Sequence, residues 1–236
     1  MRPVKILLKV VIGLILLGLL LFGTLFIIYD QPLPQGETGA AANALAQKML
    51  TALHYDQYQA TRFLEWSYIG GKHRYKWDKE NGIVQVAWKR YKVDLDLNKS
   101  DRSKVFRNGS AVIGDDRSEL IEKAQAFFNN DSFWLVAPFK VFDKGAERRL
   151  IVLKDGSQGL LITYRSGGTT PGDSYLWKLG ADGFPKSFQL WVKIIPIGGL
   201  EASWDDWKEM ENGLSLPGSH RLGPITLYMG HVRAYN

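Results

Sequence analysis

Hydrophobic positions recur with different periods along this chain, and the longest uninterrupted apolar run comes first. Val10 to Tyr29 contains no charged residue, and as a helix it would be about 30 Å long, the thickness of a bilayer's hydrocarbon core. Residues 1–9 before it are basic, with Arg2, Lys5 and Lys9. The pattern predicts a transmembrane anchor over residues 10–29, preceded by a short basic stub.

A removable secretory signal has the same order of features, but its apolar middle is usually shorter and a small-x-small cleavage site follows closely. Here the first such patterns lie well beyond Tyr29, at Ala40, Ala42, Ala44 and Ala46. We therefore expect a signal-anchor that is not cleaved. The basic stub places the amino terminus in the cytoplasm by the positive-inside rule, and the rest of the chain in a periplasm or an equivalent compartment.

Residues 30–37, which include Pro32, Pro34 and Gly36, are expected to form a short tether. Apolar residues at three- and four-residue spacing then predict a helix over residues 39–54, with Thr38 as its amino-terminal cap. Its buried stripe would contain four side chains: Leu45, Met49, Ala52 and Leu53.

Two-residue alternation follows, interrupted by turns such as Asn81-Gly82, and this is typical of antiparallel strands. A second helix is expected over residues 117–129, capped by Asp115 or Asp116, and an apolar plug over Asp131 to Gly145. The predicted strands cover residues 61–69, 73–78, 83–89, 91–97, 104–112, 148–153, 159–166, 174–179, 187–194, 199–207 and 224–235. The expected fold class is α+β: a curved antiparallel sheet (half-barrel) wrapped around one or two helices, forming one domain over residues 38–236.

Composition excludes several kinds of chemistry. The chain has no cysteine, so disulfides, thiolate metal sites, cysteine nucleophiles and lipidation of a cysteine are ruled out. The net charge is +6, but Arg2, Lys5 and Lys9 lie before the anchor, so the domain is closer to neutral and no nucleic-acid partner is expected. The four histidines, His54, His73, His220 and His231, lack metal-ligand spacing, and we expect neither a metal nor a cofactor.

All eight tryptophans lie after the anchor, and with the plug phenylalanines they are the candidate ligand-binding residues. An aromatic set of this kind forms either an ordinary core or the lining of an apolar cavity, and the sequence leaves both readings open. The candidates are Trp66, Trp77, Trp88, Phe133, Trp134, Phe139, Trp177 and Trp191.

Other candidate sites have simpler structural interpretations. The loop from Ser166 to Ser174 is rich in glycine and could bind an anion, but it lies between two strands and favours a hairpin. Asp205 and Asp206 between Trp204 and Trp207 would suit a carbohydrate hydrolase, but the pattern favours a polar turn. The strand pair Asp94 and Asp96 reads as a solvated face.

The order of elements, an anchor followed by an amphipathic helix, a strand meander, a central helix with an apolar plug and a second meander, resembles the LolA/LolB-like lipoprotein-carrier half-barrels of the bacterial envelope. Three segments, DSFWLVAPFKVFDKG, SGGTTPGDSYLWKL and KIIPIGGLEASWDDW, also resemble those of membrane-anchored bacterial envelope proteins. The resemblance implies an apolar cavity suited to acyl chains and a place in the bacterial inner membrane with a periplasmic domain. It carries over no functional residue.

We therefore expect a non-catalytic binding module, anchored through Val10–Tyr29, whose ligand is a lipid or the acyl chain of a lipoprotein. Two alternatives stay open. One is an envelope scaffold or assembly partner with a filled core, and the other is a periplasmic carbohydrate hydrolase that uses the carboxylates near Trp204 and Trp207.

Overall fold

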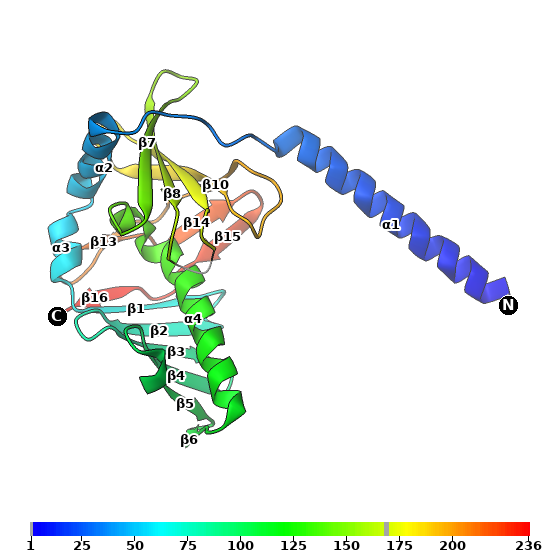
Figure 1. The fold of residues 1–236 in the computed structure, drawn as a ribbon, viewed down its shortest axis with the longest axis horizontal. Helices are drawn as coiled ribbons and strands as arrows, with labels where there is room; N and C mark the ends of the chain where they lie inside the picture. The colour runs from blue at the N-terminus through cyan, green and yellow to red at the C-terminus, as the bar shows by residue number, and fades with distance from the viewer. Residues whose placement is uncertain (1, 168–169) are drawn as a thin grey trace.

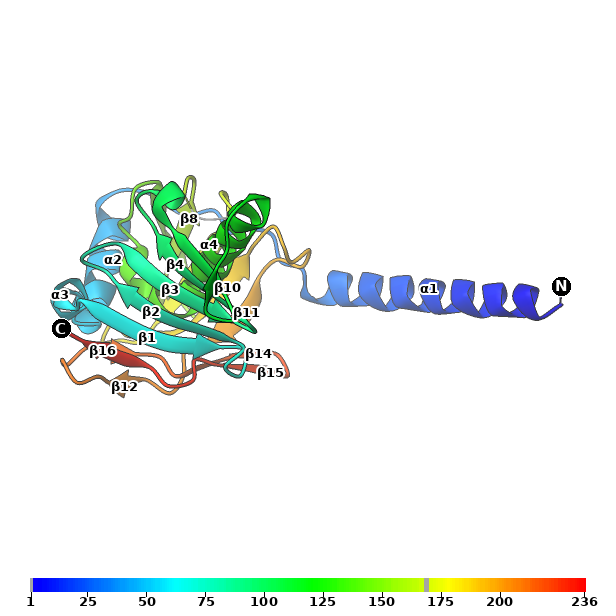
Figure 2. The same ribbon diagram turned by 90° about the horizontal axis from the view of Figure 1, so that it is seen from below.

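The structure is a computed structural model that describes residues 2–167 and 170–236, and its most conspicuous element is a helix that projects away from the domain (Figures 1 and 2). This helix, α1 (Arg2–Tyr29), includes the basic stub, because a proline in the first turn, Pro3, does not interrupt a helix. Among the described residues it is the one helix long and apolar enough to cross a membrane, over Lys5–Tyr29. The prediction of a membrane-spanning length is confirmed.

The first sheet has seven antiparallel strands in the order β16-β1-β2-β3-β4-β5-β6 within the described chain. The strands are β1 (Phe63–Tyr68), β2 (His73–Asp78), β3 (Ile83–Trp88), β4 (Tyr91–Asp96), β5 (Lys104–Arg107), β6 (Ser110–Ala111) and β16 (Arg233–Tyr235). The first four form the predicted meander, and Val84, Val86 and Trp88 share its buried face. The end of the chain returns to this sheet, where Tyr235 lies opposite Phe63.

The second sheet, in the described chain, also has seven antiparallel strands, in the order β15-β14-β11-β10-β9-β8-β7. They are β7 (Ala146–Val152), β8 (Gln158–Tyr164), β9 (Ser174–Leu179), β10 (Pro185–Trp191), β11 (Leu200–Ser203), β14 (Ser219–Leu222) and β15 (Ile225–Tyr228), and β12 (Lys208–Glu209) with β13 (Ser215–Leu216) forms a separate ribbon. The α+β class with open antiparallel sheets is thus confirmed, and the strands divide between two sheets.

The described chain has three further α-helices, α2 (Ala40–Ala52), α3 (Tyr55–Ala60) and α4 (Asp115–Val136), and the short 3₁₀ turns η1 (Ser100–Arg102) and η2 (Ala137–Lys140). α2 packs on β7 and β8, and α4 lies across β3, β4 and β5 (Figure 1). Leu45, Met49 and Leu53 are buried as predicted, whereas Ala52 is half-buried.

Both predicted helix caps are wrong. α2 begins after Gly39 and α4 after Gly114, and neither helix has a side-chain capping bond. The φ angle is 113° at Gly39 and 81° at Gly114, values that residues with a side chain rarely adopt. The turn that leads into each helix therefore requires glycine. Asp115 and Asp116 lie in the first turn of α4, where their charge favours the positive end of the helix dipole.

The predicted plug is also different in kind. α4 does not end at Asn129 but continues to Val136, and η2 with Pro138 follows directly. The apolar residues expected in an irregular plug are therefore carried on the last turns of a long helix. This helix passes from the first sheet to the second, and its position organises the candidate site.

Candidate functional site

The carboxyl-terminal half of α4 carries two aromatic pairs, and the first pair packs on the first sheet. The ring of Phe128 lies 5.2 Å from that of Trp77 and 6.3 Å from that of Trp66. Phe127 meets Trp88 edge to face at 5.5 Å. Because all five rings point into one layer, they form a continuous apolar surface between the helix and strands β1 to β3.

The second pair, Phe133 and Trp134, packs on the second sheet. Both contact Phe188 of β10, with ring centroids 6.2 Å and 5.7 Å away. Phe188 in turn lies 5.2 Å from Trp177 and 5.9 Å from Trp204. We call the two groups together the α4 seam: Phe127, Phe128, Trp66, Trp77 and Trp88 on the first sheet, and Phe133, Trp134, Phe188, Trp177 and Trp204 on the second.

The α4 seam contains polar atoms that are buried without a protein partner. The indole Nε1 of Trp66, Trp77, Trp177 and Trp204 has no hydrogen-bond partner among the described residues. A buried indole N–H normally donates to an acceptor, and leaving one unpaired costs about 1–3 kcal/mol. The four indoles come from both sides of the seam, and this number of unpaired donors distinguishes the seam from an ordinary apolar core.

A polar cluster ties α4 to the first sheet in the middle of the seam. Asp131 is 1% exposed, and its Oδ2 accepts hydrogen bonds from Tyr75 Oη at 2.6 Å and from His73 Nδ1 at 2.7 Å. Burial and the neighbouring Asp131 carboxylate raise the pKa of Tyr75 above its ordinary value, so the phenol stays protonated and donates. The cluster fixes the rotation of α4 over the sheet.

His220 is a second buried polar group, in the part of the seam that packs on the second sheet. Its ring lies 4.5 Å from that of Trp204 and 5.2 Å from that of Trp134. Nδ1 is 3.0 Å from the Ser203 carbonyl oxygen, to which it donates, and Nε2 has no partner in the described chain. Burial lowers the pKa of His220 to about 4, against the opposing effects of the Ser203 and Trp134 backbone groups, so the ring is neutral near pH 7.

Six of the eight predicted ligand-binding residues belong to the seam: Trp66, Trp77, Trp88, Phe133, Trp134 and Trp177. Phe139 lies elsewhere, stacked on Tyr58 of α3 at 4.3 Å. Trp191 lies on the outer side of the second sheet with Ile151, Leu161 and Leu176, and its Nε1 donates to the Gln31 carbonyl at 2.7 Å. The structure therefore brings most of the predicted set together along one helix and separates two members from it.

Sequence reasoning missed Asp131, Tyr75 and Phe188. Tyr75 and Phe188 alternate with polar neighbours in β2 and β10, so their inward direction could have been read from the period of two. Asp131 gave no such signal, because it follows Asn129 and Asn130 in a polar run that reads as a loop.

The carboxylates of the hydrolase alternative have structural partners. Asp205 accepts a hydrogen bond from the Ser203 hydroxyl, and Asp206 pairs with Lys208 at 3.3 Å. Trp204 between the strands is 3% exposed and points into the core, away from a surface subsite. On the first sheet, Asp96 accepts the backbone N–H groups of Asn98 and Lys99 and so closes a turn.

The Gly-rich loop from Ser166 to Ser174 includes residues 168 and 169, which lie outside the described residues. Its acid, Asp173, is 5% exposed and accepts from the Lys193 backbone N–H at 3.0 Å. The Thr170 hydroxyl also donates to this carboxylate, so Asp173 joins the end of the loop to the turn after β10.

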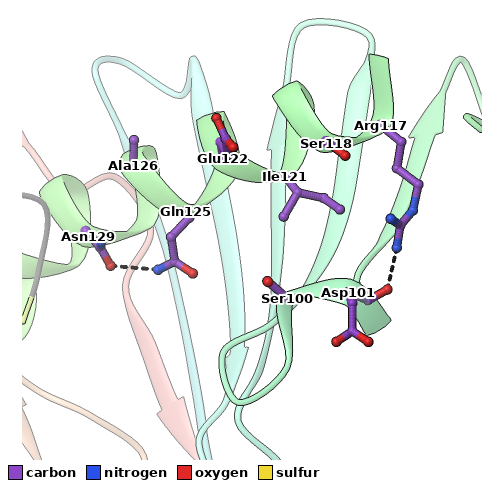
Figure 3. Close-up of a pocket in the computed structure, with 9 residues that line it drawn as sticks. All are labelled: Ser100, Asp101, Arg117, Ser118, Ile121, Glu122, Gln125, Ala126 and Asn129. Carbon is purple, nitrogen blue, oxygen red and sulfur yellow. Dashed lines mark hydrogen bonds between the residues drawn. The ribbon is translucent and has the colours of Figure 1, made fainter. Parts of the chain in front are cut away.

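An open groove of about 600 Å³ lies beside the amino-terminal half of α4, across from η1 (Figure 3). Ile121 points into it from the helix, and Arg117 closes one end by donating to the Asp101 carbonyl at 2.6 Å. Its lining residues are Ser100, Asp101, Arg117, Ser118, Ile121, Glu122, Gln125, Ala126 and Asn129. Polar residue types outnumber the apolar Ile121 and Ala126 in this lining, which contains none of the predicted aromatic residues.

Within the described chain, no group of three or more His, Asp or Glu side chains is placed to bind a metal ion. The sequence matches no protein-family model, and no curated protein matches it significantly.

Proposed function

We propose that this protein is a membrane-anchored, non-enzymatic binding module for an apolar ligand with a polar end, a lipid or the acyl part of a lipoprotein. The ligand would lie along the α4 seam. The proposal includes the likeness to the LolA/LolB-like lipoprotein carriers and the same placement, with the amino terminus in the cytoplasm and the domain in the periplasm of a bacterium.

The observation that carries the proposal is the set of unpaired indole N–H groups inside an aromatic layer. Ligand sites of this type are lined by apolar and aromatic side chains, with a few polar groups that fix the orientation of the ligand. Ester, carboxyl or amide oxygens of a lipid would accept from the indoles of Trp66, Trp77, Trp177 or Trp204. Each acyl CH₂ group that leaves water adds about 0.8 kcal/mol.

Access to the seam requires α4 to separate from a sheet, and few polar contacts oppose this. At its amino-terminal end, Asp116 pairs with Arg107 at 2.8 Å and Arg117 donates to two backbone carbonyls of the η1 region. Near the middle, Asp131 provides the cluster described above. These polar contacts lie at the start and near the middle of α4, and the aromatic layer lies between and beyond them.

The test is photocrosslinking of the full chain in vesicles that contain a lipid with a diazirine near the end of its acyl chain. We expect adducts on α1, which report the membrane, and separate adducts on the seam residues Trp66, Trp77 or Phe128. A matched pair of variants, Trp66→Phe and Trp88→Phe, separates loss of the donor from loss of ring size. Both substitutions shorten the ring, but only Trp66 has a buried, unpaired N–H, so only Trp66→Phe removes a donor of this kind. Adducts on α1 alone would contradict ligand binding in the seam.

The scaffold alternative is favoured by a specific observation: Trp177 and Phe188 are fully buried against each other. A filled core of this kind needs no ligand, and its partner would be a protein. Crosslinking in membranes would then give one protein adduct and no lipid in the seam.

A further inference from the structure

The first residues after α1 are bonded directly to the turn between β10 and β11. Asp30 Oδ1 accepts from the Gly198 N–H at 2.8 Å, and the Gln31 N–H donates to the Gly198 carbonyl at 3.0 Å. Trp191 Nε1 donates to the Gln31 carbonyl at 2.7 Å. No flexible spacer therefore separates the end of α1 from the domain (Figure 1).

Two glycines make this close approach possible. A Cβ at Gly198 would come within 2.9 Å of the Gln31 carbonyl oxygen and 2.5 Å of the Trp191 ring. A Cβ at Gly199, where φ is +79°, would come within 2.7 Å of Gln31 Cβ. The two glycines of the turn thus allow the tether to pack closely against it, and the turn lies next to the carboxyl-terminal end of α1.

The turn presents an apolar tip. Ile194 is 70% exposed, Pro196 is exposed, and Lys193 beside them is exposed and cationic. The backbone of the tip is fixed, because Lys193 N–H donates to buried Asp173 and Ile195 N–H donates to the Val192 carbonyl. Residues 192–199 therefore form an ordered loop with an isoleucine pointing outward.

We propose that the 192–199 loop lies in the interfacial layer of the bilayer that α1 spans, with Ile194 among the upper acyl chains and Lys193 at the lipid phosphates. The partner is a lipid surface, because the loop is bonded to the residue that follows the apolar helix. Tyr29 is the last residue of α1 and Trp191 donates to Gln31 two residues later, and tyrosine and tryptophan are enriched at membrane–water interfaces. This inference rests on the anchoring part of the proposed function.

The chain has no cysteine, so single-cysteine variants of the full chain can report depth in the membrane. The test uses Ile194→Cys, Val152→Cys and Leu20→Cys, each labelled with the fluorophore NBD, in phosphatidylcholine–phosphatidylglycerol vesicles. Val152 is the matched control, because it is an aliphatic residue with 72% exposure. It lies two residues after Leu150, where Glu37 of the tether pairs with β7. Leu20 lies in the middle of the apolar run Val10–Tyr29 and reports the anchor itself.

We expect the label at residue 194 to lose emission with nitroxides in the headgroup or upper acyl chain, and its emission to shift to the blue. The label at residue 20 should be quenched from the methyl end of the acyl chain, and the label at residue 152 should not be quenched by any lipid nitroxide. If the label at 194 behaves like that at 152 while the label at 20 is quenched, the loop inference is wrong and the anchor stands. An unquenched label at residue 20 refutes the anchor and the loop inference together.

Discussion

At the scale of single residues, Asp131 is the side chain whose removal has the clearest consequence. It is a buried carboxylate on α4 that accepts hydrogen bonds from His73 and Tyr75 on β2. In Asp131→Ala both donors lose their acceptor inside an apolar layer, and we expect a loss of about 3 kcal/mol in the free energy of unfolding. Urea unfolding of the full chain in detergent, followed by tryptophan fluorescence, measures it.

The matched control is Asp116→Ala on the same helix, whose side chain is 65% exposed and pairs with Arg107 at the surface. Exposed ion pairs contribute little to stability, so the urea concentration at the unfolding midpoint should be close to that of the parent chain. Equal effects of the two substitutions would show that the Asp131 cluster does not hold α4.

His220 predicts a dependence of stability on pH. Burial lowers its pKa to about 4 in the folded chain, compared with about 6.5 in the unfolded chain. Because the unfolded state binds the proton more tightly, the stability that depends on a neutral His220 is fully present above about pH 6.5. It is lost as the pH falls towards 4. Between pH 7 and pH 5 this residue alone removes about 2 kcal/mol from the free energy of unfolding.

Other groups also titrate in this range, so the readout is a difference between two chains. His220→Gln retains a polar side chain of similar length and does not titrate. Unfolding free energies of the parent and the variant are measured at pH 7 and at pH 5. The parent should lose about 2 kcal/mol more than the variant, and parallel losses would place His220 in a hydrated environment instead.

At the scale of elements, the carboxyl-terminal end of α4 is set by tertiary contacts and not by the local sequence. The run Asn129, Asn130, Asp131 and Ser132 is typical of a loop, so the sequence predicts a helix end there. In the structure Asp131 and Ser132 are buried, and the helix continues to Val136. Contacts with β2 outweigh the local preference, and these contacts come from residues more than fifty positions earlier in the chain.

Pairing between strands distant in sequence is equally hidden. The meander from β1 to β4 could be predicted, because tight turns join strands that follow one another. The placement of β16 beside β1 could not, because no local signal tells Arg233–Tyr235 to leave the second sheet and pair with Phe63–Glu65. The chain thus leaves the second sheet after β15 and ends in the first.

The tether offers a test at this scale. Glu37 pairs with Leu150 of β7 through two backbone hydrogen bonds, of 3.1 and 2.8 Å. A Cβ at Gly36 would overlap the Leu150 carbonyl oxygen and the Ile151 side chain, so Gly36→Ala should displace this bridge. We expect amide hydrogen exchange at Glu37 and Leu150 to accelerate about tenfold, equivalent to about 1.4 kcal/mol of local stability.

Gly23→Ala in α1 is the control, because nothing lies within 4 Å of its Cβ position. Its exchange at Glu37 should match that of the parent chain. Unchanged exchange in Gly36→Ala would mean that the tether opens freely and that the bridge does not fix it.

At the scale of the whole molecule, the sequence predicted which aromatic side chains point inward, but not how these side chains group in space. Trp66, Trp77 and Trp88 lie on three consecutive strands, β1, β2 and β3, so their shared layer follows from the period of two in each strand. That Trp177 joins Phe133 and Trp134, while Trp191 faces the tether, depends on which face of the second sheet meets α4. This arrangement follows from packing α4 across both sheets, which no single segment encodes.

The packing of the tether also bears on whether the anchor is retained. The small-x-small patterns nearest to α1 lie inside α2, where Ala42 and Ala46 are 0% exposed. A processing enzyme that cut there would have to unfold α2, and it would remove the residues that pair with Gly198 and Leu150. We therefore expect the chain isolated from membranes to retain its full mass of 26.7 kDa and to resist extraction by alkaline carbonate.

The control for this last prediction is the double variant Ile27→Ala with Tyr29→Ala, which places a small-x-small site at the exposed end of the apolar run. We expect this variant to be shortened, released from the membrane and still folded, because α2 and both sheets lie beyond the new site. A parent chain that is already shortened to a start between residues 30 and 46 would contradict the retained anchor. It would also remove the physical basis for holding the 192–199 loop against the bilayer, since that loop depends on Asp30 and Gln31 remaining joined to α1.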